Sequence, residues 1–498
     1  MAHIETTTAG SLPRTDALIA ANAARAFEED GFTLKTSPEH EALVAEAVRD
    51  VVERQQRAGI TQPGDGEFGK AMSNAVDYGA WWGYSFQRVA GLALTGRSAF
   101  TDAPKRSTPG HIELTSFADR RDRARFADMY ADPEWGMHQS KWASRMPTTV
   151  EALTYRGQQA VAADVTNLRA SLGDSKTGFL TAIAPGSAAR VPNEFYQSDE
   201  DHLFAWSDAL AEEYRAITDA GLVLQIDDPS LCESWDQINP EPAVSDYLDF
   251  IQLRIDAINR AVEGLPREQV RLHLCWGSWH GPHTTDIELK HILKTVLGAK
   301  VGQISFEAAN ARHEHEWTVW QENAHLIPDD LVLVPGVVGH STNLVEHPEL
   351  VAQRIERFAR IVGPERVIAS TGAKARGIRD KCTIKYHYPI GRLHTIKEVA
   401  TWVKPHFERM GIEHETLFNI KEVDVEKKVV RSEEGTESEY DLLIAIPPHR
   451  GMEVVEQNGM GEAGWIPTDR FKLTMNGYDN VYVVGDTTNL PVSKTGSA

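Results

Sequence analysis

The chain has 498 residues, 41% hydrophobic and 25% charged, which excludes an intrinsically disordered protein and suffices for one large and one smaller domain. A formal charge of −21 opposes contact with phosphate backbones and anionic bilayers, so we expect no nucleic-acid partner. No segment approaches the ~20 apolar residues of a membrane span, and the first residues lack the pattern of a secretory signal. We therefore expect a cytoplasmic protein.

Short segments rich in β-branched residues alternate with longer helix-compatible segments over the first three quarters of the chain. We predict eight strands, at residues 4–11, 59–67, 177–187, 222–229, 270–277, 301–307, 331–339 and 366–371. Amphipathic helices are predicted between several of them, for example at 41–58 and 346–361. This alternation predicts an α/β protein whose residues 1–371 form a (β/α)8 TIM barrel. Residues 78–150 are too long for a plain connection and predict an insertion over the barrel mouth.

The sequence pattern changes after Thr371, where we place a domain boundary. We predict a strand at 382–390, a helix at 395–410, a β-meander at 415–432, and strands at 441–448 and 480–486. Residues 372–498 are therefore expected to form a smaller, incomplete α/β module.

His273 and Cys275 lie two residues apart on a predicted strand, so their side chains project from the same face. Imidazole and thiolate suit zinc, and Glu307 at the end of the next predicted strand can supply an oxygen ligand. The other cysteines, Cys232 and Cys382, are too scattered to indicate disulfides. A buried core His and Cys is the alternative from the pattern alone, although the following loop, WGSWHGPHTTD, is typical of an active-site lining.

Six motifs occur in order along the chain: TTTAGSLPR, GDGEF, LQIDDPSL, HLCWG, ISFEAANAR and LVPGVVGHSTNLVEHPELV. Over about three quarters of its length the chain thereby resembles cobalamin-independent methionine synthases, most closely the short type with a single barrel. The resemblance implies a zinc enzyme that binds homocysteine as a thiolate and methylates it from a methylated folate. Short members also resemble transferases that open epoxides with a thiol cofactor, so the acceptor thiol and the methyl donor stay open.

The same resemblance implies individual roles. The zinc ligands would be His273, Cys275 and Glu307. Ser11 would hold the carboxylate of the amino-acid substrate, and Glu67 and Asp227 its ammonium group. His340 in GVVGHST stands near the position of the family's proton-donating histidine, with a spacing that differs by about a residue, and a solvated loop histidine is the alternative.

One zinc ligand of the family is absent at its expected position. Family members carry Asp-Cys-Gly directly after the eighth strand, whereas here Thr371 is followed at once by Gly372, and the next thiol is Cys382. Three protein ligands and a water form a common catalytic zinc site, so we expect zinc to bind with lowered affinity.

The segments YPIGRLHT, EYDLLIAIPPHRG, GWIPTDRF and VYVVGDTTNLPVSK resemble the C-terminal half of sulfide:quinone oxidoreductase-like flavoproteins, within the pyridine nucleotide-disulfide oxidoreductase superfamily. By this resemblance Gly485 and Asp486 would approach the ribityl and phosphate part of FAD. Such proteins need an N-terminal G-x-G-x-x-G turn, and the one formal match, residues 64–69, belongs to predicted strand two. We therefore expect little or no FAD binding.

Three hypotheses follow. The first is a zinc-dependent methyltransferase acting on a small thiol and a methyl donor. The second is a flavin oxidoreductase built on residues 372–498, and the third is an inactive chimera of two enzyme pieces. The oligomeric state stays open.

Overall fold

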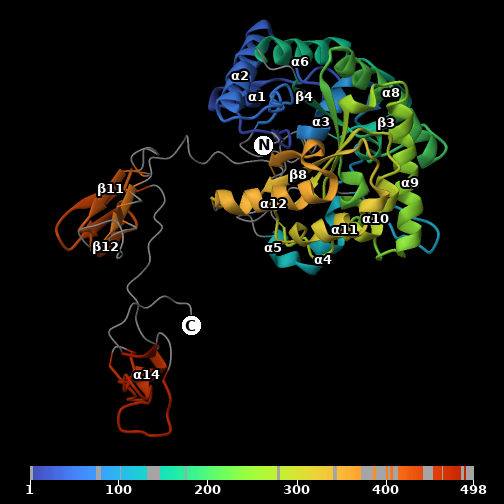
Figure 1. The fold of residues 1–498 in the computed structure, drawn as a ribbon. Helices are drawn as coiled ribbons and strands as arrows, with labels where there is room; N and C mark the ends of the chain where they lie inside the picture. Colours follow the sequence, from blue (N-terminus) through green and yellow to red (C-terminus); the bar gives the residue numbers. More distant parts are fainter. Residues whose placement is uncertain are drawn as a thin grey trace. The chain divides into compact units, whose positions relative to one another are not determined.

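Seven parallel strands from the first three quarters of the chain form one curved sheet with helices around it (Figure 1). In order across the sheet they are β1 (Glu5–Thr6), β9 (Ile368–Thr371), β8 (Val332–Val338), β7 (Gln303–Glu307), β6 (Val270–Leu274), β5 (Val223–Asp228) and β4 (Phe179–Ile183). The computed structural model describes residues 4–73, 80–100, 102–131, 146–173, 177–277, 281–339, 345–371, 385–388, 400–401, 404–405, 407, 413–440, 453–462, 464–483 and 487–489.

Residues 61–64 close the sheet into a barrel between β1 and β4. Gln62 forms a parallel bridge with Thr7, and Gly64 forms one with Phe179. The N–H of Phe179 donates to the carbonyl of Pro63 at 3.2 Å, and the hydroxyl of Thr7 donates to the carbonyl of Gln62 at 2.8 Å. Because proline has no N–H to donate, this second barrel position is a short bridged segment and not a regular strand. The predicted (β/α)8 architecture is confirmed.

The helices bury apolar faces against the barrel. The main ones are α1 (Asp16–Ala24), α2 (Pro38–Arg57), α6 (Gln158–Ser171), α8 (Asp199–Asp219), α9 (Val244–Ala261), α10 (Leu289–Val296), α11 (Trp317–Glu322) and α12 (Pro348–Val362), and α7 (Pro185–Ala188) is a single turn. Helix α2 shows how the sequence determines where such a helix begins and which face it buries. Ser37 caps it by accepting the N–H of His40, Pro38 occupies the first turn, and Val44, Val48 and Val52 are buried on one face.

An antiparallel ribbon stands out in the region predicted as an insertion. It pairs β2 (Val89–Ala93) with β3 (Thr148–Tyr155), and the helices of this region are α3 (Ala80–Arg88), α4 (Arg121–Arg125) and α5 (Ala127–Ala131). The N–H groups of Ser107 and Thr115 donate to the carbonyls of Asn239 and Gln237, in the loop that follows β5. The region thus contacts the carboxyl end of the barrel.

The chain divides into two compact units, Met1–Gly377 and Ile378–Ala498. The second unit contains a parallel pair, β10 (Lys385–Tyr388) and β11 (Glu413–Thr416), and an antiparallel sheet of β12 (Ile420–Asp424), β13 (Val429–Ser432) and β14 (Glu437–Glu439), as well as helix α14 (Glu453–Gln457). The predicted helix at 395–410 and strand at 441–448 lie largely or wholly outside the described residues. Of the predicted strand at 480–486, residues 480–483 are described, and there Tyr482 forms a single antiparallel bridge with Thr474. Within the described residues, no helix is long and apolar enough to cross a bilayer.

Candidate functional site

Arg271 on β6 shows which side chains face the barrel interior. Its guanidinium donates to Gln225 on β5 at 3.2 Å, to Gln303 on β7 at 2.9 Å and to Gln62 at 2.8 Å. Gln62 belongs to the bridged segment on another side of the barrel, so the Arg271 side chain must cross the interior. Since side chains alternate along a strand, His273 shares this inward face.

The next inward layer carries the candidate residues. Asp227, His273 and Ser305 are paired in register on β5, β6 and β7. His273 is buried, and its Nδ1 lies 3.1 Å from the hydroxyl oxygen of Ser305. Where this hydroxyl accepts the Nδ1 proton, the Nε2 lone pair can face a metal ion, because metal-binding histidines usually donate their other ring N–H to a neighbouring oxygen.

Cys275 and Glu307 lie at the carboxyl ends of β6 and β7. The surrounding protein keeps water away from the Cys275 thiol and thereby raises its pKa, and the negative charge of Glu307 raises this pKa further. Glu307 is buried, and its Oε2 accepts the amide of Asn310 at 3.3 Å. Burial also raises the pKa of Cys232, with a contribution from Cys275. A cation bound beside these thiols would favour their ionisation, because its positive charge stabilises the thiolate.

The donor chemistry therefore fits zinc, although the donors are not yet gathered around one point. Within the described ranges, no three His, Cys, Asp or Glu side chains form a ready metal site. His340, the predicted proton donor, and Cys382, the next thiol after Thr371, lie outside the described residues. The same holds for Gly485 and Asp486, the predicted flavin contacts. At the position of the missing ligand, the hydroxyl of Thr371 accepts the N–H of Ala9 at 3.3 Å, which ties β9 to the end of β1.

Glu67 sits in a strained turn on the opposite side of the interior. Its φ is 62°, a left-handed value that is uncommon outside glycine and is often found at functional sites. Asp65 stabilises the turn by accepting the N–H of Glu67 at 2.8 Å. Ser11 follows Gly10, where an added Cβ would lie 2.8 Å from Glu67 Oε1, so the β1 loop passes close to this carboxylate. Burial raises the pKa of Asp65 to about 7.

Lys70 and Thr181 are site residues that our sequence interpretation missed. The ammonium of Lys70 donates to the hydroxyl of Thr181, which in turn donates to Glu67 Oε1 at 3.1 Å. Lys70 stands three residues after Glu67 in GDGEFGK, and a lysine so close to a barrel strand end was the available signal.

A charged network holds the inserted region over the carboxyl end of β5. Arg120 donates to Glu233 at 2.6 Å and to Asp236 at 2.7 Å, and all three are buried. Asp236 also accepts the hydroxyl of Thr285, in the loop after β6. The insertion, the β5 loop and the β6 loop are thereby joined.

A second buried cluster fixes the loop that follows Cys275. His313 lies 2.8 Å from Glu316 and 3.1 Å from Asp286, and its ring is 4.2 Å from that of Trp276. Burial alone would lower the pKa of His313, but the hydrogen bonds and charges of the two carboxylates outweigh it and raise this pKa to about 9. The cluster orients the residue next to Cys275.

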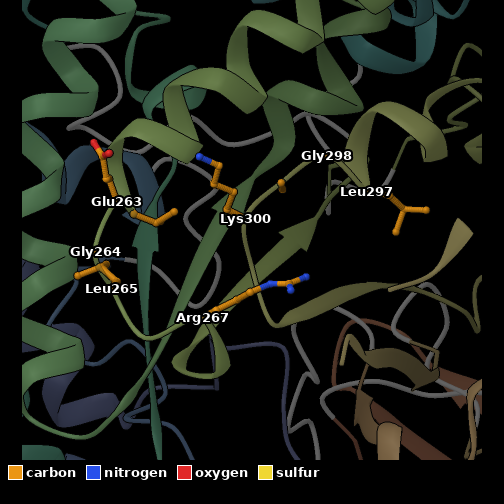
Figure 2. Close-up of a pocket in the computed structure, with 9 residues that line it drawn as sticks. Glu263, Gly264, Leu265, Arg267, Leu297, Gly298 and Lys300 are labelled. Atoms are coloured by element: carbon orange, nitrogen blue, oxygen red, sulfur yellow. The ribbon is translucent and has the colours of Figure 1, made fainter. Parts of the chain in front are cut away.

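A surface pocket of 480 Å³ lies elsewhere (Figure 2). It is lined by residues that precede β6 and β7, among them Glu263, Arg267 and Lys300. This is the amino-terminal end of the strands, whereas catalytic groups of TIM barrels sit at the carboxyl end.

The fold and the site together define a TIM barrel with charged and sulfur-containing side chains at the carboxyl ends of its strands, the arrangement of barrel enzymes. The fold is similar to that of a B12-independent methionine synthase from Shewanella sp. W3-18-1, with a TM-score of 0.51 and 19% identity, over 74% of this chain and 90% of that one. The chain is 29% identical over 178 residues to methionine synthase from Thermococcus kodakarensis, which is 35% of this chain and 44% of that protein.

The chain is also similar to sulfide:quinone oxidoreductases, in line with the resemblance of its C-terminal part. It is 26% identical over 130 residues to mitochondrial sulfide:quinone oxidoreductase from Dictyostelium discoideum, which is 25% of this chain and 29% of that protein. The chain thus spans less than half the length of both curated relatives. No protein-family model matches it.

Proposed function

We propose that the barrel is a zinc-dependent methyltransferase that moves a methyl group from a methylated folate to a small thiol such as homocysteine. The proposal depends most on one observation, the path of Arg271 across the barrel interior. This path shows which face of β6 points into the barrel. His273 lies on that face, and Cys275 directly follows the end of the strand. The similarity to methionine synthases supports the same assignment.

His273, Cys275 and Glu307 would hold the zinc ion, which when bound would lower the pKa of the acceptor thiol. Ser11, Glu67 and Asp227 would hold the polar end of the acceptor, with Asp227 beside His273 and Glu67 across the interior from them. The closed barrel and its inserted region would exclude water from the reacting sulfur.

The transfer is a displacement at carbon. The acceptor sulfur, having lost its proton, forms a bond to the methyl carbon, while the bond from this carbon to the donor nitrogen breaks. The nitrogen keeps the electron pair and takes up a proton, for which His340 is the proposed source. His313, with its pKa raised to about 9, would stay protonated and hold Trp276 in place.

The test is the zinc content of the purified full chain and of two cysteine variants. We expect zinc in the wild-type protein, a large loss in Cys275→Ser, and an unchanged content in Cys382→Ser, the matched control. Equal, near-zero zinc in all three proteins would refute the zinc site. The remaining hypothesis for the barrel would then be an inactive chimera. If zinc is present, inserting an Asp-Cys pair after Thr371 should raise its affinity.

A second candidate function, an FAD-dependent oxidoreductase of the sulfide:quinone type, is favoured by the similarity to that enzyme. It would use residues 372–498, with Gly485 and Asp486 against the flavin. Such enzymes require a glycine-rich turn at the start of a helix. The formal match to this turn, residues 64–69, is part of the barrel, because Gly64 forms a β-bridge with Phe179. We propose that residues 372–498 bind little or no FAD. A flavin absorption band in the purified protein would reverse this assignment.

A further inference from the structure

Arg14 joins the two segments that carry Ser11 and Glu67, the residues proposed to hold the carboxylate and the ammonium of the substrate. Its side chain belongs to the segment after β1 and is buried. Its Nη2 donates to the carbonyl of Glu67 at 2.5 Å and to the carbonyl of Lys70 at 2.9 Å. The guanidinium also lies over the ring of Phe68, 5.6 Å from its centre. Arg14 therefore contacts both ends and the middle of the turn that begins at Glu67.

Two further contacts bring the segment after β1 against this turn. The N–H of Leu12 donates to the carbonyl of Gly66 at 3.1 Å. Gly10 has a φ of 129°, and a Cβ at this position would lie 2.8 Å from Glu67 Oε1, so only glycine permits this close approach. Ser11 stands between Gly10 and Leu12 in the chain. Its backbone is thus held beside the turn on both sides.

The turn needs support because Glu67 has a left-handed φ of 62°. A residue with a side chain is strained in this region and persists there only where its surroundings fix it. Asp65 accepts the N–H of Glu67 at 2.8 Å, and the carbonyl of Glu67 accepts the N–H of Lys70 at 3.0 Å. These bonds shape the turn from within, whereas Arg14 fixes it from the neighbouring segment. Loss of Arg14 would let the turn shift relative to Ser11.

The contacts of Arg14 described above act on position. Both hydrogen bonds end on backbone oxygens, so they determine where the turn lies. The turn also contains three titratable side chains. Lys70 Nζ lies 3.9 Å from Glu67 Oε1, and burial raises the pKa of Asp65 to about 7. Replacement of Arg14 leaves all three of these groups in the turn.

We infer, on the basis of the proposed function, that Arg14 is a positioning residue that fixes the spacing between Ser11 and Glu67. An α-amino acid carries its carboxylate and its ammonium on one carbon, so two partners can hold both groups at once only at a matching spacing. Arg14 thereby makes the site specific for a thiol that carries the two groups side by side, as homocysteine does.

Three thiols separate the two contacts. Homocysteine carries both charged groups, 4-mercaptobutyrate lacks the ammonium, and 3-mercaptopropylamine lacks the carboxylate. Isothermal titration calorimetry with the purified full chain would give the three dissociation constants. We expect the wild-type protein to bind homocysteine about tenfold more tightly than either partial thiol, or better, the usual order for one further hydrogen bond to a charged group.

Arg14→Met should weaken homocysteine binding by about the same tenfold factor and leave the two partial thiols unchanged, because each of them needs only one contact. Arg14→Lys should recover part of the loss, since its ammonium can still donate to the turn. Arg25→Met is the matched control, because Arg25 also donates to two backbone carbonyls, those of Leu34 and Lys35, and it should change none of the three constants. Circular dichroism checks that each variant is folded, and the wild-type comparison requires no variant.

The outcomes separate this inference from the proposed function. Wild-type binding of homocysteine that is no tighter than that of the partial thiols overturns the inference, and so does unchanged homocysteine binding by Arg14→Met. Equal losses for all three thiols would show a general structural role, and tighter binding of 3-mercaptopropylamine by Arg14→Met would show an effect of charge; either result also overturns it. All of these leave the methyltransferase proposal standing. Failure of all three thiols to bind the wild-type protein at millimolar concentration overturns the proposed function, and the inference with it.

Discussion

The barrel and the C-terminal unit differ in how much apolar surface surrounds their polar groups. In the barrel, buried apolar side chains form one cluster that runs from Leu18 to Val367. In the described part of the C-terminal unit, the buried cluster consists of Val455, Ile466 and Val483. Holding a desolvated charge costs several kcal/mol unless rigid partners compensate it. The large apolar core of the barrel is thus what allows it to keep charged groups buried.

The ion pairs follow the same division. Arg120 in the barrel is 3% exposed and lies between two buried carboxylates, Glu233 and Asp236. Arg431 in the C-terminal unit also has acidic neighbours, the nearest being Glu437 at 2.5 Å, but its side chain is 28% exposed. We therefore expect equal changes of charge to have unequal effects in the two units.

The largest effect is expected for Arg120→Met. The variant leaves Glu233 and Asp236 without their shared cation, and breaking such a buried pair costs about 3–5 kcal/mol of unfolding free energy. Urea unfolding, with hydrogen exchange of peptides from each unit, would locate the loss in the barrel. Arg97→Met is the control, because its partner Asp102 forms an exposed pair at 3.1 Å. Because both arginines belong to the first unit, equal effects of the two substitutions would show that burial does not set the cost of losing an ion pair.

A smaller effect should appear as a pH dependence confined to the barrel. The pKa of His313 is about 9 in the folded protein, above its ordinary value near 6.5. The stabilisation from its protonated form is therefore complete below about pH 6.5 and is lost as the pH rises through 9. Linkage gives an upper limit of about 3 kcal/mol for this loss.

His313→Asn should remove that slope, since asparagine carries no proton to lose in this range. The measurement is the unfolding free energy of the barrel at pH 6, 7.5 and 9.5. An equal slope in wild type and variant would show that other groups, such as the nearby His283 and Asp286, cause it.

The barrel was predictable because its signals are local and repeated. Each predicted strand range contains an observed strand or, for residues 59–67, the bridged segment at Gln62 and Gly64. The ribbon of β2 and β3 was not predicted, because its partners are Val89–Ala93 and Thr148–Tyr155, and pairing over such a separation leaves no local pattern.

The candidate site was only partly predictable. The spacing of His273 and Cys275 indicates a shared strand face, and the course of Arg271 agrees with it. The position of Lys70 near a strand end could be seen in the sequence, but its hydrogen bond to Thr181 could not be predicted, because Thr181 lies on a different strand. The zinc ligands, the substrate contacts and His340 stay predictions.

A matched pair of smaller substitutions tests the difference in packing between the two cores. Val301 is fully buried in the barrel cluster, and Val483 is 4% exposed in the small cluster. Val301→Ala should cost about 2 kcal/mol, since the rigid surroundings leave a cavity, and Val483→Ala about 1 kcal/mol, because a small cluster can relax around the loss. Hydrogen exchange of each unit is the readout. A larger loss for Val483→Ala would show that the C-terminal unit is packed more tightly than its described residues indicate.

The smallest effect is expected for Arg431→Gln. This side chain lies near Glu422 and Asp424 on β12 as well as Glu437 on β14, and together they hold an exposed charge cluster on the antiparallel sheet. Water and salt screen exposed pairs, and ordering long side chains offsets much of the gain. We expect no measurable change in the hydrogen exchange of this sheet at physiological salt. A clear loss of protection that disappears at high salt would instead show that charge, in place of a large apolar core, stabilises the C-terminal unit.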